Sequence, residues 1–112
     1  MNIQIYGRNK CFDTKKAQMF FKERKIKFQF VEIDRFSMGG RELEACERAC
    51  GLYQLINEKS PLYQSLNLDK IRVPDLIRKT LLENPKAFKT PIVRNGKNAT
   101  VGYKPEVWKG WE

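Results

Sequence analysis

The first third of the chain reads strand, helix, strand, and this order constrains the fold more than any other feature. Residues 3–6 alternate polar and apolar side chains, as a half-buried strand does. A helical pattern follows, with Ala17, Phe20 and Phe21 on one face. Residues 27–33 alternate again and end at Asp34. Two strands joined through a helix run parallel, so this segment predicts a βαβ unit.

The middle of the chain predicts helices rather than strands. One helix opens at Gly39-Gly40, runs to about Cys50 and stops at Gly51. Prolines at positions 61 and 74 start two further helices, because proline suits the first helical turn. The dipeptide at 84–85, Asn-Pro, ends the last of them.

The end of the chain predicts a hairpin and a short helix. Residues 90–102 contain Asn95-Gly96, which we expect to supply the two positive-φ positions of a tight turn. Residues 105–111 predict an amphipathic helix with Trp108 packed against the body. We therefore expect an α/β fold: a four-stranded mixed sheet, βαβ then ββα, flanked by helices, with a helical insert at about residues 39–85. A length of 112 residues predicts a single domain, 1–112.

Cys11 falls where a loop enters the first helix. Unpaired backbone N–H groups and the positive end of the helix dipole stabilise a thiolate at that position. The cations Arg8, Lys10, Lys15 and Lys16 lie close by in the sequence and also favour the anion. A reactive, acidic thiol is therefore one interpretation. The other is a cysteine that serves as a small apolar residue.

Charge and composition narrow the classes of function. The chain carries a net charge of +9, and residues 1–30 hold eight basic residues against two acidic ones. This surplus suits an anionic substrate, a nucleic-acid surface or a solvated helix face, and no nucleic-acid motif accompanies it. The chain has no histidine, which excludes Ser-His and Cys-His pairs and histidine-bearing metal sites.

The same composition suggests a compartment. The N-terminus lacks the apolar core of a signal peptide, and no apolar run approaches the roughly 20 residues of a membrane span. Three cysteines, an odd number, argue against a secreted disulfide framework. We expect a cytoplasmic protein. Cys46 and Cys50 share a helix face with Leu43, which favours packing, and their spacing suits a local disulfide poorly.

The order of the elements, with a cysteine after the first strand and Thr90-Pro91 before the third, resembles that of thioredoxin-like proteins. The chain more closely resembles the arsenate reductase (ArsC)/Spx-like family, which contains the glutaredoxin-coupled arsenate reductases and the Spx-type regulators. The stretches that carry the resemblance are residues 5–17, 56–67, 81–85, 91–93 and 101–103. The resemblance implies that Pro91 is a cis-proline facing Cys11.

The chain also departs from the pattern of this family. Spx-type proteins often have a second cysteine at the place of Thr14, so a one-cysteine mechanism is implied here. Arsenate reductases hold the oxyanion with arginines, and the corresponding places look like Lys59, Thr90 and Lys104. Lysine keeps the charge without the planar fork of arginine, and Thr90 has no charge. Phe12 stands where those enzymes favour glycine. These changes argue against efficient arsenate reduction and leave a lysine-lined anion site.

We therefore expect a single-cysteine thiol oxidoreductase that resembles the arsenate reductases. The Cys11 thiolate attacks an oxyanion or a disulfide, and an external thiol such as glutathione or glutaredoxin resolves the adduct. We expect no bound cofactor and no metal. The residues expected to bind the anionic substrate are Lys10, Lys15, Lys59, Lys104, Thr90 and Pro91. For any single lysine, solvent-exposed charge is the competing interpretation.

Two other functions remain open on the sequence. The resemblance to Spx implies a regulator that binds a partner such as the RNA polymerase α subunit. Gly51 falls near the glycine that Spx-type proteins place on that binding face, although a helix C-cap explains Gly51 equally well. The third alternative is a thioredoxin-fold scaffold in which Cys11 has no catalytic role.

Overall fold

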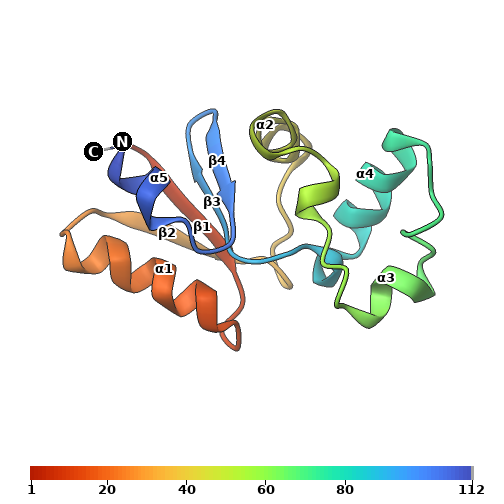
Figure 1. The fold of residues 1–112 in the computed structure, drawn as a ribbon, viewed down its shortest axis with the longest axis horizontal. Coiled ribbons are helices and arrows are strands. Elements are labelled where there is room, and N and C mark those ends of the chain that lie inside the picture. The colour runs from red at the N-terminus through yellow and green to blue at the C-terminus, as the bar shows by residue number, and fades with distance from the viewer. Residues whose placement is uncertain (112) are drawn as a thin grey trace.

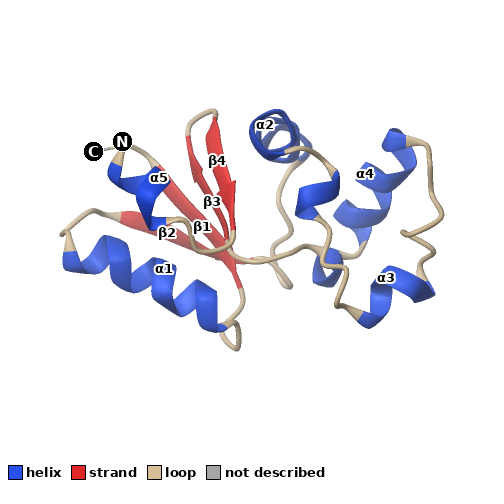
Figure 2. Ribbon diagram, in the orientation of Figure 1, coloured by secondary structure: helices blue, strands red, loops and turns tan. Residues whose placement is uncertain are grey.

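The computed structural model describes residues 1–111, which form a four-stranded sheet flanked by helices. The strands are β1 (Ile3–Gly7), β2 (Phe28–Glu32), β3 (Ile92–Asn95) and β4 (Asn98–Val101). Their order across the sheet is β2-β1-β3-β4. Strand β1 pairs parallel with β2 and antiparallel with β3, and β3 pairs antiparallel with β4. The predicted mixed sheet, βαβ then ββα, is confirmed (Figure 2).

The helices follow the predicted order. They are α1 (Phe12–Glu23), α2 (Gly40–Cys50), α3 (Pro61–Ser65), α4 (Pro74–Glu83) and α5 (Pro105–Lys109), with 3-10 turns η1 (Tyr53–Leu55) and η2 (Pro85–Ala87). Ser60 caps α3 by accepting a hydrogen bond from the N–H of Leu62. The predicted insert is confirmed, because α2, α3 and α4 all lie between β2 and β3 in the sequence. No helix within residues 1–111 has the length and apolarity needed to cross a membrane.

Helices cover both faces of the sheet. Figure 1 shows α1 and α5 on one face, α2 on the other, and α3 and α4 beyond α2. The core on the first face includes Ile5, Phe20, Phe21 and Trp108. The predicted packing of Trp108 is confirmed: its side chain is fully buried, and its Nε1 donates to Thr100 Oγ1 at 2.8 Å.

The second core joins the insert to the sheet. It includes Tyr6, Leu43, Cys46, Leu81 and Ile92. Tyr6 and Ile92 belong to this core whereas their neighbours Ile5 and Val93 belong to the first, because alternate side chains of a strand point to opposite faces. Each face of the sheet thus carries its own apolar core.

The hairpin turn lies one residue later than the sequence predicted. Asn95 still pairs with Asn98, so the two residues between the strands are Gly96 and Lys97. Gly96 has a φ of +61°, and Asn95 is not among the residues with positive φ. The prediction that both Asn95 and Gly96 supply positive φ was therefore wrong. Glycine at the first of the two loop positions is the arrangement of a type II′ turn.

Candidate functional site

Cys11 occupies the junction between β1 and α1, as the sequence predicted. It is the N-cap residue of α1, with extended backbone angles (φ −83°, ψ 118°). Its N–H donates to the carbonyl of Arg8 at 3.1 Å, which closes the preceding turn. Its side chain is half-buried, and the thiol is free rather than disulfide-bonded. The thiol therefore stands at the helix N-terminus on a partly exposed residue.

Two threonines surround the thiol. The Cys11 Sγ lies 3.7 Å from the carbonyl oxygen of Thr90. Partial burial opposes ionisation, but hydrogen bonds from the side chains of Thr14 and Thr90, and from the backbone of Thr14 and Asp13, outweigh it. The pKa of Cys11 consequently lies below the ordinary value of a cysteine thiol. Hydrogen bonds rather than lysine charges account for this lowering, because a donor aimed at the sulfur stabilises the thiolate.

Gly7 makes room for one of these threonines. Thr14 is fully buried, and a Cβ added at Gly7 would lie 2.3 Å from its Cγ2 atom. That distance is far inside van der Waals contact, so a larger residue at position 7 would displace Thr14. The last residue of β1 thus has to be glycine for the Thr14 hydroxyl to reach Cys11.

Arg8 holds the surroundings of the thiol together, a role that the sequence did not reveal. Its Nε donates to both carboxylate oxygens of Asp34, at 2.9 and 3.1 Å. Its two terminal nitrogens donate to the carbonyls of Phe88 and Pro85, each at 2.8 Å. One of them also donates to Thr90 Oγ1 at 3.1 Å. We call this set of contacts the Arg8 clamp.

Arg8 also sets the direction of the two hydroxyl groups at the thiol, one through the clamp and one through its backbone N–H. Thr90 Oγ1 accepts from the guanidinium, and Thr14 Oγ1 accepts from the Arg8 backbone N–H at 3.4 Å. A hydroxyl has one proton to give, and in both threonines that proton stays available for the sulfur because Arg8 takes the acceptor side. Asp34 neutralises the guanidinium, so Arg8 is not a free cation for substrate.

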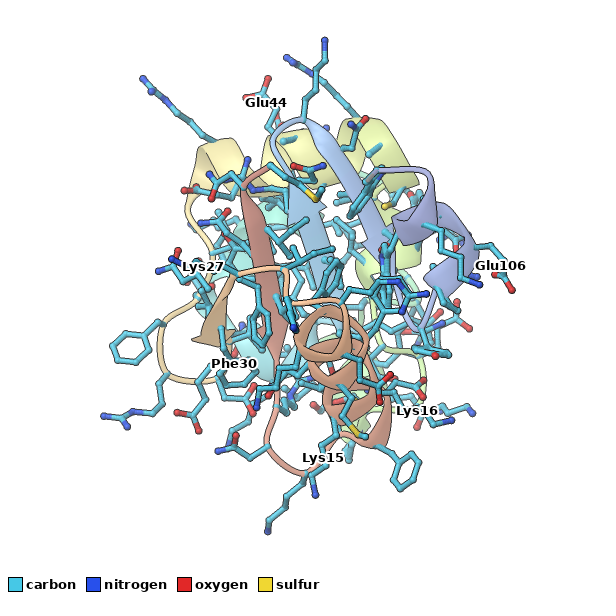
Figure 3. The ribbon with its side chains drawn as sticks, turned by 90° about the vertical axis from the view of Figure 1, so that its left-hand side faces the viewer. Lys15, Lys16, Lys27, Phe30, Glu44 and Glu106 are labelled. Atoms are coloured by element: carbon cyan, nitrogen blue, oxygen red, sulfur yellow. The ribbon has the colours of Figure 1, made fainter. Side chains whose placement is uncertain are left out.

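The structure brings some of the predicted site residues to Cys11 and leaves others apart. Thr90 contacts the sulfur, and the Thr90–Pro91 bond is cis, which confirms that part of what the resemblance implied. Lys10 and Lys15 are exposed, and Figure 3 shows Lys15 pointing away from the body.

The remaining two predicted cations line separate hollows. Lys59 lines a hollow with Asn57 and with Lys89, a residue that the sequence analysis did not select. Lys104 lines another hollow, beside Cys50 and Thr100. Lys59 and Lys104 therefore line different hollows.

Gly51 and the other cysteines lie away from the thiol. Gly51 caps the end of α2 with a φ of +92°, is exposed, and donates its N–H to the Glu47 carbonyl at 2.7 Å. Cys46 is buried, and burial raises its pKa to about 12. Cys50 is half-buried, donates from Sγ to the Ala99 carbonyl at 3.3 Å, and has a pKa raised by burial. Within residues 1–111 no group of three or more acidic, cysteine or histidine side chains is placed to hold a metal ion.

The contact with the Thr14 hydroxyl should affect how the reactivity of Cys11 depends on pH. The alkylation rate of Cys11 should rise with pH at lower pH than that of an ordinary thiol, because its pKa is lowered. Replacing Thr14 by Val removes one hydroxyl donor and should move the profile to higher pH. The difference in free energy of unfolding between wild type and this variant should grow as pH rises through the Cys11 pKa, because a depressed folded-state pKa stabilises the fold only above it.

The matched control for this pair of measurements is Thr80→Val. Thr80 Oγ1 donates within its own helix to the Leu76 carbonyl at 2.7 Å. The Thr80→Val variant should leave the pH dependence of Cys11 alkylation, measured with iodoacetamide, unchanged. An unmoved profile in the Thr14→Val variant would show that the hydroxyl does not stabilise the thiolate.

The Arg8 clamp predicts a combined effect on stability and reactivity. Arg8→Met keeps an unbranched apolar stem but removes every side-chain donor, leaving the Asp34 carboxylate without this partner. We expect the free energy of unfolding to fall by about 1–3 kcal/mol, measured by urea denaturation. The pH at which Cys11 alkylation becomes fast should also rise. The control Arg35→Met removes an exposed arginine whose nearest Glu32 oxygen is 3.9 Å away, and should change stability by less than about 0.5 kcal/mol.

Comparison with known proteins places this geometry among its relatives. The ArsC family matches residues 6–111. The chain is 30% identical over 106 residues to the global transcriptional regulator Spx 2 of Oceanobacillus iheyensis. The aligned region covers 92% of this chain and 78% of that protein.

Solved structures give the same result. An arsenate reductase from Vibrio cholerae superimposes with a TM-score of 0.85 at 25% identity, over 96% of this chain and 94% of the other. The glutaredoxin-like NrdH-redoxin of Escherichia coli shares the thioredoxin-like fold, with a TM-score of 0.52 at 17% identity, over 100% and 96% of the two chains. These likenesses support a protein of thiol-oxidoreductase character. With the match covering nearly its whole length, the chain belongs to the ArsC family.

Proposed function

We propose that the protein is a single-cysteine thiol oxidoreductase in which Cys11 is the nucleophile. The observation that carries this proposal is the position of Cys11, a free, half-buried thiol at the N-terminus of α1 and 3.7 Å from the Thr90 carbonyl, where neighbouring hydrogen bonds lower its pKa. The Cys11 thiolate attacks one sulfur of a disulfide, a new S–S bond forms to Cys11, and the other sulfur leaves as a thiolate that takes up a proton. An external thiolate then attacks the mixed disulfide and releases Cys11.

A disulfide suits this site better than an oxyanion. A tetrahedral oxyanion calls for converging arginines or lysines. Here the guanidinium of Arg8 is neutralised by Asp34, and Lys59 and Lys104 line separate hollows. Thr90 adds a hydroxyl and no charge. Arsenate is therefore the weaker of the two candidate substrates.

The resolving thiol comes from outside the chain. The place of a second cysteine near Cys11 is taken by Thr14. Cys46 is buried with a pKa of about 12, and the pKa of Cys50 is also raised, so both stay protonated at neutral pH. Glutathione or glutaredoxin is the expected reductant, and the protein needs no bound cofactor for this chemistry.

The Spx-like regulator is the second candidate, and its support is the 30% identity to Spx 2. In that role the chain would bind the RNA polymerase α subunit through the surface around Gly51, which is exposed at the end of α2. The Thr14 side chain cannot form the disulfide of a CxxC switch. The regulator would then act without the redox control of a cysteine pair.

Cys11→Ser tests the first candidate. The wild type incubated with glutathione disulfide should form a mixed disulfide at Cys11, seen by peptide mass spectrometry, and glutathione with glutaredoxin should reverse it. The Cys11→Ser variant should form none, whereas Cys50→Ser should behave as wild type because Cys50 has a raised pKa. Modification of Cys50 with Cys11 left unmodified would reject Cys11 as the nucleophile. Separately, reduction of arsenate by the wild type would show that an oxyanion, rather than a disulfide, is the substrate.

Gly51→Glu tests the second candidate. A carboxylate at this exposed position should weaken binding to the C-terminal domain of the RNA polymerase α subunit by about tenfold or more, as a hot-spot substitution does. Gly51→Ala is the matched control, because alanine suffers the same backbone strain at a φ of +92° without adding charge. Equal binding by both variants, measured by calorimetry, would remove Gly51 from any such interface.

A further inference from the structure

The residue next to the nucleophile is a large aromatic side chain that faces solvent. Phe12 is 72% exposed, directly after Cys11. Lys16, one helical turn further along α1, places its Nζ 5.2 Å from the centre of the Phe12 ring and 5.5 Å from that of Tyr103. Tyr103 itself is 40% exposed. Lys16 therefore links the aromatic ring beside the thiol to the segment that leads into α5.

A groove continues from this point between α1 and α5. The described residues that line it include Lys16, Met19, Arg24, Tyr103, Pro105 and Lys109. Met19 is 57% exposed, although it is unbranched and apolar. In Figure 3 this side of the molecule faces the viewer, and Lys16 points outward from α1. We call Phe12 together with the residues of this groove the α1–α5 surface.

We propose that the α1–α5 surface docks a protein that carries the thiol resolving Cys11, and that the partner presents an apolar side chain surrounded by acidic residues. This inference rests on the proposed oxidoreductase function. It replaces the open choice of external thiol by a protein thiol, and it names the face from which that thiol arrives.

The charges of the surface favour an acidic protein. Of the described residues that line the groove, Lys16, Arg24 and Lys109 are cationic and Glu23 is acidic. Arg24 lies over the ring of Phe20, with its guanidinium carbon 3.9 Å from the ring centre. A second copy of this chain would bring another net charge of +9 to the same place and be repelled.

The dimensions of the surface favour a protein over a small thiol. Met19 lies eight residues beyond Cys11 in the α1 direction, which is about 12 Å along a helix. A tripeptide such as glutathione spans about 10 Å when fully extended. Attached through its central cysteine, it could not cover Met19 and Tyr103 while reacting at Cys11. A protein that approaches along α1 buries both.

The exchange itself balances with a dithiol partner. The partner's first thiolate attacks the glutathione sulfur of the Cys11 mixed disulfide, and Cys11 leaves as a thiolate. Its low pKa makes Cys11 the better leaving group. The partner's second thiol then loses its proton, attacks the new mixed disulfide and releases glutathione. The partner dithiol is oxidised to a disulfide by two electrons, and the Cys11–glutathione disulfide is reduced by two.

Phe12→Ala and Phe36→Ala form a matched pair for testing this surface. Phe36 is 60% exposed, and Arg35 lies over its ring at 5.2 Å, as Lys16 lies over that of Phe12. The full chain, glutathionylated at Cys11, is reduced either by an acidic glutaredoxin or by dithiothreitol, and the release of glutathione is followed with time. Phe12→Ala should slow the glutaredoxin reaction about tenfold and leave the dithiothreitol reaction unchanged. Phe36→Ala should change neither rate.

Met19→Glu provides a second variant at the far end of the groove. It should slow the glutaredoxin reaction by adding a like charge opposite an acidic partner, and should spare the dithiothreitol reaction. Wild-type glutaredoxin rates in both Phe12→Ala and Met19→Glu overturn the docking proposal. The docking proposal is also overturned if these variants keep the wild-type glutaredoxin rate but lose self-association or DNA binding, because the surface would then bind a second copy of the chain or DNA. A chain that never becomes glutathionylated at Cys11 defeats the proposed function instead, so the two failures are distinguishable.

Discussion

One guanidinium group connects the parts of the protein that make the candidate site. The Arg8 clamp links the loop after β1 to Asp34 beyond β2 and to the carbonyls of Pro85 and Phe88 at the end of the insert. These partners lie 26, 77 and 80 residues away in the sequence. The position of Thr90 against the thiol depends on this arrangement, because the same guanidinium donates to its hydroxyl.

The clamp also decides what kind of acidity the thiol has. The charge of Arg8 is neutralised by Asp34, and its hydrogen bonds go to the surrounding backbone. Arg8 therefore holds the neighbouring segments in place and does not act as a free positive charge. The thiolate is stabilised through hydroxyl and amide donors at short range. Such donors are little affected by salt, whereas a field of exposed lysines would be screened within about a Debye length of 10 Å. The basic surface is then available for the approach of partners rather than for activation of the thiol.

Much of the fold could be predicted from local patterns, and most of the site could not. The alternation of residues 3–6 and the apolar face of α1 determine the βαβ unit, and proline positions mark the starts of α3, α4 and α5. The turn was predicted one residue too early. Glycine adopts a positive φ at either central position of a tight turn, so the presence of Gly96 does not determine which two residues form the turn. Cys11 was located correctly because a helix N-terminus is a local feature. Arg8 was counted as one positive charge among several, since nothing nearby in the sequence shows its distant partners.

The buried Thr14 limits what this scaffold can become. It fills the place that the resemblance to Spx-type proteins assigns to a second cysteine, and Gly7 leaves space for a side chain of about this size. A sulfur at that position would supply a partner for a disulfide and would take away a hydroxyl that keeps Cys11 acidic. One position therefore serves either a switch that records oxidation or a thiol kept ready to react. On the proposed function, the threonine in this chain favours the reactive thiol, and any stored disulfide has to be formed with another molecule.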